Sequence, residues 1–495
     1  MAWFSRRITK EEEREVSEPM ESAEFEGAEG AVGTKRQFIV YLAINIAIGF
    51  LLYFWLRDVK QTLAGSIFLA TVIGTLMFWR FRLAIAFIGI FVLLVTRTID
   101  LHHTIEFMNL DVIVFLIGMM VIVGLVRRTG FFRWLLAKGL QLSGFNANRL
   151  MLIILFLSAL MAAMVDEVTS ILFVTALVLD LCDFFKVKPV RYVISVVLAT
   201  NIGSSWTVLG NPIGILIALR SGLTFEDFVG TALPIGLLSL VSLMIIVLLW
   251  QRGDLRQLKA RIQEARPEER RRFLEELSAI SDRRLFVGGT SIFVGVIIFL
   301  ALHYRLELAL GLEHNTLLVA TSIFGAGVLM LWQRRIAREL VMKEVDWWTL
   351  LFFMFLFAKA GCLAYVGLTN VIADSLAALT GSGTAAPLAV LILWISGITS
   401  AAMDNVVVVA AFIPVLQDLT PIVGSPILWW ALLFGACYGG NMTMVGSTAN
   451  IVALGVLEDR KGYHMTLKYW IYIGLLGSLV PMAVATLALL VALAL

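Results

Sequence analysis

The chain has 495 residues, of which 60% are hydrophobic and only 15% are charged, and its mean hydropathy is +0.90. This composition excludes an ordinary soluble protein and indicates a polytopic membrane protein. The formal net charge is only +3 and the basic residues fall in separate loops, which excludes nucleic acid as a partner. The five histidines and three cysteines form no HExxH motif and no paired-cysteine pattern. We therefore expect no enzymatic activity, no cofactor and no metal beyond a transported or coupling Na+.

After a polar segment at residues 1–36, which we predict to be a flexible cytoplasmic tail, apolar runs near the length of a membrane crossing follow one another. Two runs, 150–182 and 386–420, are too long for one crossing and are interrupted near their middles by acidic residues. We predict that each forms a re-entrant hairpin. The remaining runs predict an all-α fold with eleven transmembrane helices at 38–56, 61–79, 83–98, 109–126, 191–219, 231–250, 285–303, 315–332, 347–366, 427–457 and 469–494.

Lysine and arginine favour cytoplasmic loops, so their distribution orients the predicted helices. The segment 252–284 contains ten of these residues and seven acidic ones, and we expect it to be a solvated cytoplasmic linker helix. The segments 367–385 and 420–426 contain no lysine or arginine, so we place them outside. This orientation gives an integral protein of a bacterial-type inner membrane with a cytoplasmic N-terminus.

Two parts of the chain resemble each other at an offset of about 235 residues. SALMAAMVDEV, from Ser158, matches SGITSAAMDNV, from Ser396. NIGSSWTVLGNPIGI, from Asn201, corresponds to GGNMTMVGSTANI, from Gly439. The loop charges orient the two copies in opposite directions across the membrane. Inverted repeats with one broken helix each are the signature of a secondary transporter, because a transporter uses such breaks to line its binding site.

The repeat defines the domain organisation and the two broken helices. The breaks fall within the predicted spans 191–219 and 427–457, where backbone groups freed from the helix need partners that lipid does not offer. We predict six successive parts, namely the tail, N-terminal membrane helices at 37–107, a first repeat at 108–251, the linker at 252–284, further membrane helices at 285–345 and a second repeat at 346–495.

Four charged residues, Asp166, Glu167, Asp404 and Lys359, fall inside apolar segments. On insertion scales each costs about 2.5–3.5 kcal/mol at the centre of a helix. One interpretation is that Lys359 is a counter-ion that forms a structural pair with one carboxylate. The interpretation that we favour is that at least one carboxylate exchanges a proton or binds a cation, because burial shifts a carboxylate towards a proton-accepting state near neutral pH.

Short polar side chains near the hairpin tips and helix breaks supply neutral oxygen atoms, which suit Na+ or a small polar solute. The second half of each broken helix also points backbone N–H groups at the cavity, which favours an anion there. The alternative is that some of these side chains only cap the broken helices. The candidates are Thr169, Ser204, Ser205, Thr207, Asn211, Asn405, Asn441, Thr443, Ser447 and Asn450.

A family resemblance rests on LGNPIGILI from Leu209, on GGNMTMVGSTANIVALG from Gly439 and on the two acidic hairpin motifs. These motifs resemble those of the arsenite efflux permeases, the NhaD-type sodium/proton antiporters and the pink-eyed-dilution P proteins, permeases of the ion transporter superfamily with a citrate-transporter-like domain. The resemblance covers about residues 108–494. It implies a fixed scaffold domain, a moving transport domain, elevator-type alternating access and a homodimer.

The first repeat departs from the family pattern, which has Asp-Asn at the hairpin and Gly-Asp-Pro-Pro-Asn at the break. This chain has Asp166-Glu167 at the hairpin and Asn211 at the second position of the break. A carboxylate has therefore moved from the break to the hairpin.

The leading hypothesis is a proton- or sodium-coupled ion transporter, with cation/proton antiport as its first version and arsenite-type metalloid or anion efflux as its alternative. A membrane-embedded enzyme and a non-transporting relative are the rival classes. The expected partners are a small inorganic ion or small polar solute, the lipid bilayer and a second copy of the chain.

Overall fold

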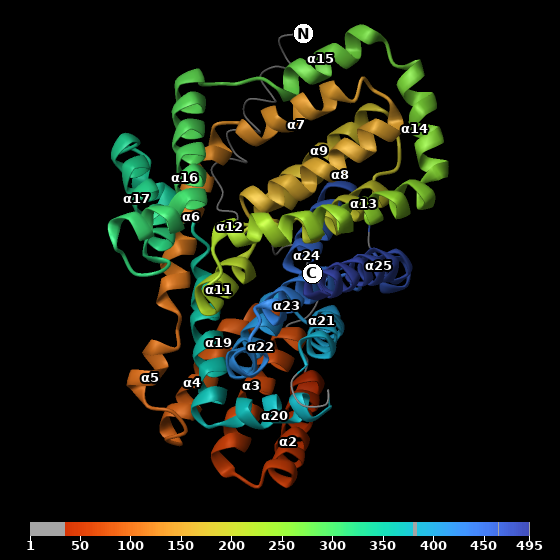
Figure 1. Cartoon of the computed structure of the whole chain (residues 1–495). Helices are drawn as coiled ribbons and strands as arrows, with labels where there is room; N and C mark the ends of the chain where they lie inside the picture. Colours follow the sequence, from red (N-terminus) through yellow and green to blue (C-terminus); the bar gives the residue numbers. More distant parts are fainter. Residues whose placement is uncertain (1–34, 380–383, 464, 495) are drawn as a thin grey trace.

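The computed structural model describes residues 35–379, 384–463 and 465–494, so nearly all of the predicted tail lies outside the described residues. Every regular element in these residues is helical (Figure 1). Ten of the described helices are long and apolar enough to cross a membrane. Three of the four halves of the two predicted broken spans are shorter apolar helices, because each span is interrupted. The all-α polytopic fold expected from the sequence is thus confirmed.

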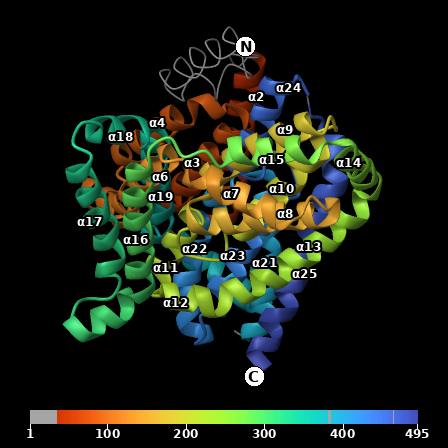
Figure 2. The same ribbon diagram turned by 90° about the horizontal axis from the view of Figure 1, so that it is seen from above.

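The helices within residues 35–128 and 283–365 gather on one side of the molecule and at one end of it (Figures 1 and 2). The helix Leu110–Arg128 packs against Arg283–Leu310 and Thr316–Trp332, the two long helices that follow the linker. The helix Trp347–Tyr365, which opens the second repeat, packs against Val59–Met77 and Arg82–Val95. These elements are α2 (Lys35–Leu56), α3 (Val59–Met77), α4 (Arg82–Val95), α5 (Leu101–Glu106), α6 (Leu110–Arg128), α16 (Arg283–Leu310), α17 (Thr316–Trp332), α18 (Ala337–Lys343) and α19 (Trp347–Tyr365).

The same series of elements occurs twice. After α6 come α7 (Phe131–Leu142), the helical hairpin of α8 (Ala147–Met164) and α9 (Glu167–Phe184), and the broken pair of α10 (Val190–Gly203) and α11 (Pro212–Ser221). After α19 come α20 (Leu368–Leu379), the hairpin of α21 (Ala385–Ala402) and α22 (Asn405–Val423), and the broken pair of α23 (Ile427–Gly439) and α24 (Thr448–Lys461). Each series ends in a long apolar helix, α13 (Leu233–Trp250) or α25 (Leu467–Ala494).

Each broken helix belongs to both repeats. Its first half packs against the hairpin of its own repeat, α10 against α8 and α23 against α21. Its second half crosses to the other hairpin, so that α11 packs against α22 and α24 against α9. Each first half lies very close to the hairpin of its own repeat. A Cβ on Gly203 would lie 2.1 Å from the carbonyl oxygen of Ala159 on α8, and a Cβ on Gly439 would lie 2.2 Å from the carbonyl oxygen of Gly397 on α21. Glycine is required at both crossings because there is no room for a side chain.

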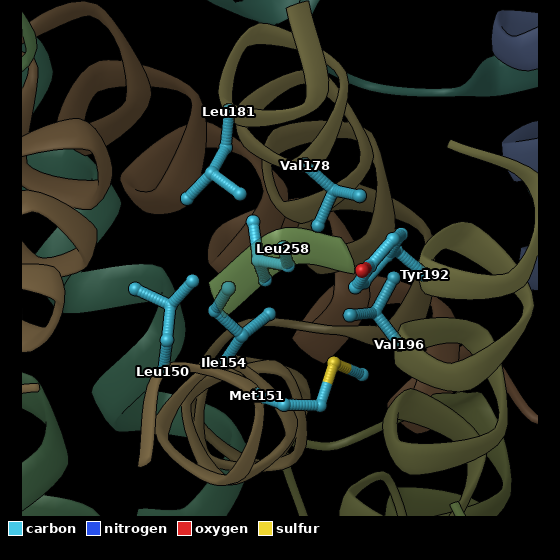
Figure 3. A pocket seen from close by; sticks show the side chains of 8 residues that line it. All are labelled: Leu150, Met151, Ile154, Val178, Leu181, Tyr192, Val196 and Leu258. Atoms are coloured by element: carbon cyan, nitrogen blue, oxygen red, sulfur yellow. The ribbon is translucent and has the colours of Figure 1, made fainter. Parts of the chain in front are cut away.

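The linker was predicted as one solvated helix, and this prediction is wrong. It forms two helices, α14 (Arg252–Glu264) and α15 (Pro267–Leu277), because the chain is extended at Ala265 and Arg266 immediately before a proline. One side of α14 is also buried rather than solvated. Leu258 closes a small apolar cavity of about 10 Å³ between α8, α9 and α10 (Figure 3). The linker is therefore anchored on the first repeat by apolar packing.

Candidate functional site

Four helices begin in the interior of the protein, where the hairpin tips meet the helix breaks. The residues before α9, α11, α22 and α24 cap these helices, because the side chain of each accepts a hydrogen bond from a backbone N–H of the following turn. These four capping residues are Asp166, Asn211, Asp404 and Ser447. Since a helix N-terminus carries a partial positive charge, the arrangement favours a negative group between the four ends.

Glu167 supplies that negative group. Its side chain is 3% exposed, and the side chains around it come from both repeats. Asn211 Nδ2 lies 3.5 Å from one carboxylate oxygen, and Ser447 Oγ lies 3.5 Å from the other. Asn405 Nδ2 lies 3.4 and 3.5 Å from the two oxygens. A tight charge-assisted hydrogen bond is about 2.7–2.9 Å long, so these neutral donors surround the carboxylate without binding it closely.

This carboxylate has no cationic partner among the lysines and arginines of residues 35–379, 384–463 and 465–494. Within the described part of the chain, neither lysine nor arginine forms an ion pair with Glu167. In addition, Asn405 Oδ1 is buried and has no hydrogen-bond partner among the described residues. Buried polar atoms are normally satisfied, and this oxygen can only accept. The site therefore presents one charged and one neutral oxygen acceptor to a proton or a cation.

The other two acidic candidates are held as helix caps. Asp404 is 8% exposed and accepts hydrogen bonds from Val406 N at 2.9 Å and from Thr448 Oγ1 at 2.5 Å. Asp166 accepts from the backbone N–H of Thr169 at 2.7 Å. The side chain of Asp166 forms no hydrogen bond with the second repeat among the described residues. The structure thus brings Glu167, Asn211, Asn405 and Ser447 together and leaves Asp166 and Thr169 outside this group.

Asn201 is the connecting residue that the sequence analysis did not select. Its Nδ2 donates to Asn441 Oδ1 and to Asn450 Oδ1, both at 2.8 Å, and its Oδ1 accepts from Ser447 Oγ at 3.0 Å. The amide nitrogens of Asn441 and Asn450 donate to backbone carbonyl oxygens at 2.8–3.2 Å. These two amides are consumed by protein partners and hold the second break to α10. Asn201 is the first residue of the first break motif, and this position is the signal by which it could have been identified.

The threonines of the two breaks make equivalent contacts. Thr207 Oγ1 donates to the carbonyl oxygen of Ala163 and Thr443 Oγ1 to that of Ala401, each at 2.5 Å. Each hydroxyl thus ties a break to the hairpin tip of its own repeat. The two serines of the first break also form contacts with neighbouring polar groups. Ser204 Oγ accepts a hydrogen bond from Asn211 Nδ2 at 3.1 Å, and Ser205 Oγ lies 3.3 Å from the hydroxyl of Tyr438.

Lys359 does not pair with a transport-site carboxylate, so the structure does not support the interpretation in which it is a structural counter-ion. Lys359 lies on α19 with 1% of its surface exposed, and its Nζ donates to Thr71 Oγ1 on α3 at 2.6 Å. Gly89 on α4 provides the space, because a Cβ there would lie 2.9 Å from Nζ. The side chain turns towards α3 and α4 and makes no ion pair within the described residues. It cannot serve as the counter-ion of Glu167 in this conformation.

The duplicated hairpins and broken helices, which meet at a polar centre inside an apolar helical protein, define a membrane transporter. Residues 67–435 match the citrate transporter family, CitMHS. The chain belongs to this family, as the citrate-transporter-like resemblance of its motifs predicted.

Several known proteins are similar to the chain. An uncharacterized transporter of Mycobacterium tuberculosis is 34% identical over 350 residues, which are 70% of this chain and 78% of the relative. The human P protein is 28% identical over 462 residues, and the match spans 79% of this chain and 54% of that protein. The crystal structure of the YdaH transporter of Alcanivorax borkumensis matches with a TM-score of 0.50 and 18% identity over 77% of this chain and 85% of that one. The similarity to YdaH concerns the fold alone.

Proposed function

We propose that the protein is a secondary transporter that exchanges a monovalent cation for protons, with Glu167 as the group that binds them alternately. The observation that carries this proposal is a buried carboxylate with neutral donors at 3.4–3.5 Å and no ion pair. A buried charge without compensation costs several kcal/mol. A proton or a bound cation removes that cost, so exactly one of them is favoured at a time.

The surroundings of Glu167 support a cation of the Na+ type. Sodium prefers hard oxygen ligands, and the carboxylate, the unpartnered Asn405 Oδ1 and the hydroxyl of Ser447 are of this kind. The Asn405 and Ser447 side chains belong to the second repeat, whereas Glu167 belongs to the first. A cation at this point would therefore link the two hairpins. We assign the hairpins and the broken helices to the part that moves in an elevator-type mechanism, and the helices within residues 35–128 and 283–365 to the part that stays fixed.

Anion or metalloid efflux is the second candidate, and the four convergent helix N-termini favour it. The same observation limits this candidate, because Glu167 already occupies the position that these helix ends favour for negative charge. A multiply charged carboxylate such as citrate would face this resident charge without a lysine or arginine in the described site to bind it. For that reason we rank cation exchange above export or uptake of an anion.

The test is flux in proteoliposomes at several pH values, with Na+, Li+, K+, citrate and arsenite as separate substrates. Wild type should carry a monovalent cation against a proton gradient. Glu167→Asn should abolish this exchange, because the variant loses the protonatable oxygen. Adding Asn211→Asp should restore part of it, because Asn211 Nδ2 lies 3.5 Å from the Glu167 carboxylate and an aspartate there returns a carboxylate to the same site.

Lys359→Met is the matched control, since it removes another buried charge that lies outside the site. It should leave the pH dependence of flux unchanged. Coupled exchange that survives in Glu167→Asn would assign coupling to Asp166 or Asp404 instead. Proton-coupled transport of citrate or arsenite, without cation exchange, would favour the second candidate.

A further inference from the structure

A groove of about 430 Å³ lies where α10 and α25 begin and α14 leaves the membrane helices. It joins three parts of the chain that are far apart in sequence, namely the first repeat, the linker and the second repeat. Its walls carry two basic side chains, one acidic side chain and three hydroxyl groups, from Lys188, Arg191, Asp254, Tyr463, Thr466 and Tyr469. None of these residues belongs to the group around Glu167, so the groove is separate from the proposed transport site.

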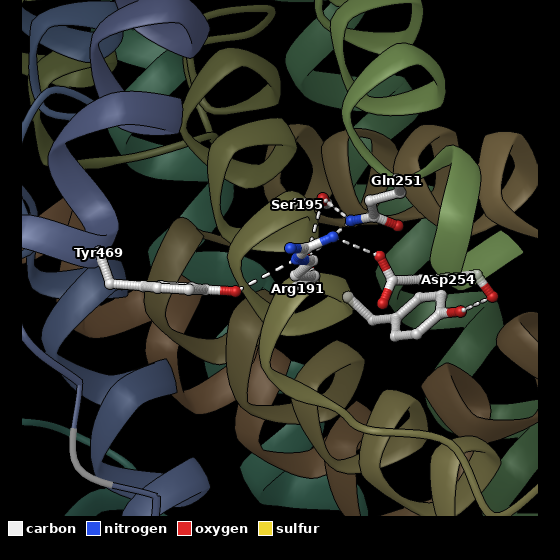
Figure 4. A network of polar contacts seen from close by, with 6 residues as sticks. Arg191, Ser195, Gln251, Asp254 and Tyr469 are labelled. Atoms are coloured by element: carbon white, nitrogen blue, oxygen red, sulfur yellow. Dashed lines mark hydrogen bonds and ion pairs between the residues drawn. The ribbon is translucent and has the colours of Figure 1, made fainter.

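The groove contains one positive charge that forms no ion pair with the described acidic residues. Arg191 Nη1 pairs with Asp254 Oδ2 at 2.7 Å, and Arg191 Nε donates to the hydroxyl of Tyr469 at 3.2 Å (Figure 4). These contacts fix the guanidinium, and they pair it with Asp254, the one acidic side chain among the described residues of the wall. Lys188 is exposed and has no partner among the described residues. The hydroxyls of Tyr463 and Thr466 are also without hydrogen-bond partners in that part of the chain.

The start of α10 adds to the positive potential. This helix of 14 residues begins after Pro189 with no side-chain cap, so no capping side chain satisfies the N–H groups of its first turn. Val190 and Arg191, its first two residues, line the groove. Hydroxyl donors, two cationic side chains and an uncapped helix N-terminus together suit a phosphate group, which has several oxygen acceptors and a negative charge.

The aromatic residues place the groove at the depth of lipid headgroups. The guanidinium carbon of Arg191 lies 5.3 Å from the ring centroid of Trp250, and two tyrosines stand in the wall. Tyrosine and tryptophan gather at the boundary between hydrocarbon and water. The loop charges assign this end of α10 to the cytoplasmic side, where anionic lipids attract basic residues.

We propose that this groove binds a phosphate group, carried either by an anionic phospholipid headgroup or by free phosphate from the cytoplasm. The bound phosphate would lie between Lys188 and Arg191 of the first repeat and Tyr463, Thr466 and Tyr469 of the second repeat. It would bridge α10 and α25 beside the linker. This inference does not depend on which ion the transport site carries.

The experiment measures binding to the purified full-length protein, from the rise in its unfolding temperature with ligand concentration. The two probes are phosphatidylglycerol in phosphatidylcholine mixed micelles and inorganic phosphate, with phosphatidylcholine alone as the reference. Lys188→Ala should weaken the binding of phosphatidylglycerol about fivefold, the effect of one lysine near an anionic headgroup. Lys188→Glu should weaken it further. Lys259→Ala, an exposed lysine on α14 outside the groove, is the matched control and should bind as wild type does.

The two probes separate the sources of the phosphate. Stabilisation by phosphatidylglycerol alone assigns a lipid headgroup, and stabilisation by inorganic phosphate that is lost in the Lys188 variants assigns free phosphate. The proposal is overturned if both Lys188 variants bind both probes as wild type does. It is equally overturned if Lys259→Ala loses as much affinity as Lys188→Ala, because the effect would then be a general one of surface charge.

Discussion

Replacing Glu167 with glutamine should stabilise the protein while it stops coupled transport. The substitution keeps the shape of the side chain and removes its charge. In wild type the side-chain donors that the described residues offer the ionised carboxylate lie at 3.4–3.5 Å, and together with the helix N-termini they offset only part of its loss of hydration. Burial of one ion costs several kcal/mol, and weak neutral hydrogen bonds return only part of that cost. Glutamine can also donate to an amide oxygen, and Asn405 has one without a partner.

We therefore expect Glu167→Gln to raise the free energy of unfolding by about 1–3 kcal/mol at alkaline pH in the absence of a bound cation. Saturation of wild type with its cation at 100 times Kd should stabilise it by about 2.7 kcal/mol, and this gain should be missing in the variant. The assay is thermal unfolding in detergent across pH, in NaCl and in choline chloride at equal ionic strength.

The contrast between the two proteins is what tests the reasoning. Wild type should become more stable on acidification or on addition of its cation, since either neutralises the carboxylate. The stability of Glu167→Gln should respond to neither. If the two proteins give parallel curves under all conditions, or if the glutamine variant is the less stable one at every pH, Glu167 does not carry an uncompensated charge and the proposed role fails.

Two further changes test the architecture. Asn201→Leu should lower the free energy of unfolding by about 2–6 kcal/mol, because it leaves two buried amide oxygens without a donor at about 1–3 kcal/mol each. The control, Asn45→Leu on α2, should change the free energy of unfolding by much less. Equal stability of the two variants would contradict the role of Asn201 as a connecting residue. In a cysteine-free background, an impermeant thiol reagent added outside should label Ala378→Cys and spare Lys259→Cys, and the opposite result would reverse the predicted topology.

Much of the fold could be predicted because its signals are local. Helix breaks within apolar spans need glycine, serine and asparagine, and these residues recur in both repeats. The two hairpins follow from apolar runs that are too long for one crossing and contain a central acidic residue. The helices α7 and α20 were missed because each has only 12 residues and falls below the length of a crossing. The division of the linker was missed although Pro267 marks it.

The partners of the site residues could not be predicted in the same way, because they depend on how distant helices cross. The sequence shows that Glu167, Asn405 and Ser447 are buried polar residues, but not that the last two lie within 3.5 Å of the first. The direction of the Lys359 side chain could not be predicted either. Its position within an apolar segment suggested a carboxylate partner, yet the side chain turns to Thr71 on α3. Burial can be estimated from a sequence, whereas the direction of a side chain depends on packing.

In the proposed mechanism, the equivalence of the two hairpins explains why Glu167 faces an amide rather than a second carboxylate. Asp166 and Asp404 cap equivalent helices, so Glu167 and Asn405, the residues that follow them, occupy equivalent positions. These two side chains meet at 3.4 Å. Two carboxylates at that distance would repel each other, and one would have to hold a proton permanently. A carboxylate opposite an amide avoids this constraint, since the amide donates through its nitrogen and accepts through its oxygen. The first repeat thus supplies the charge, and the second supplies a partner that suits both the ionised and the protonated form.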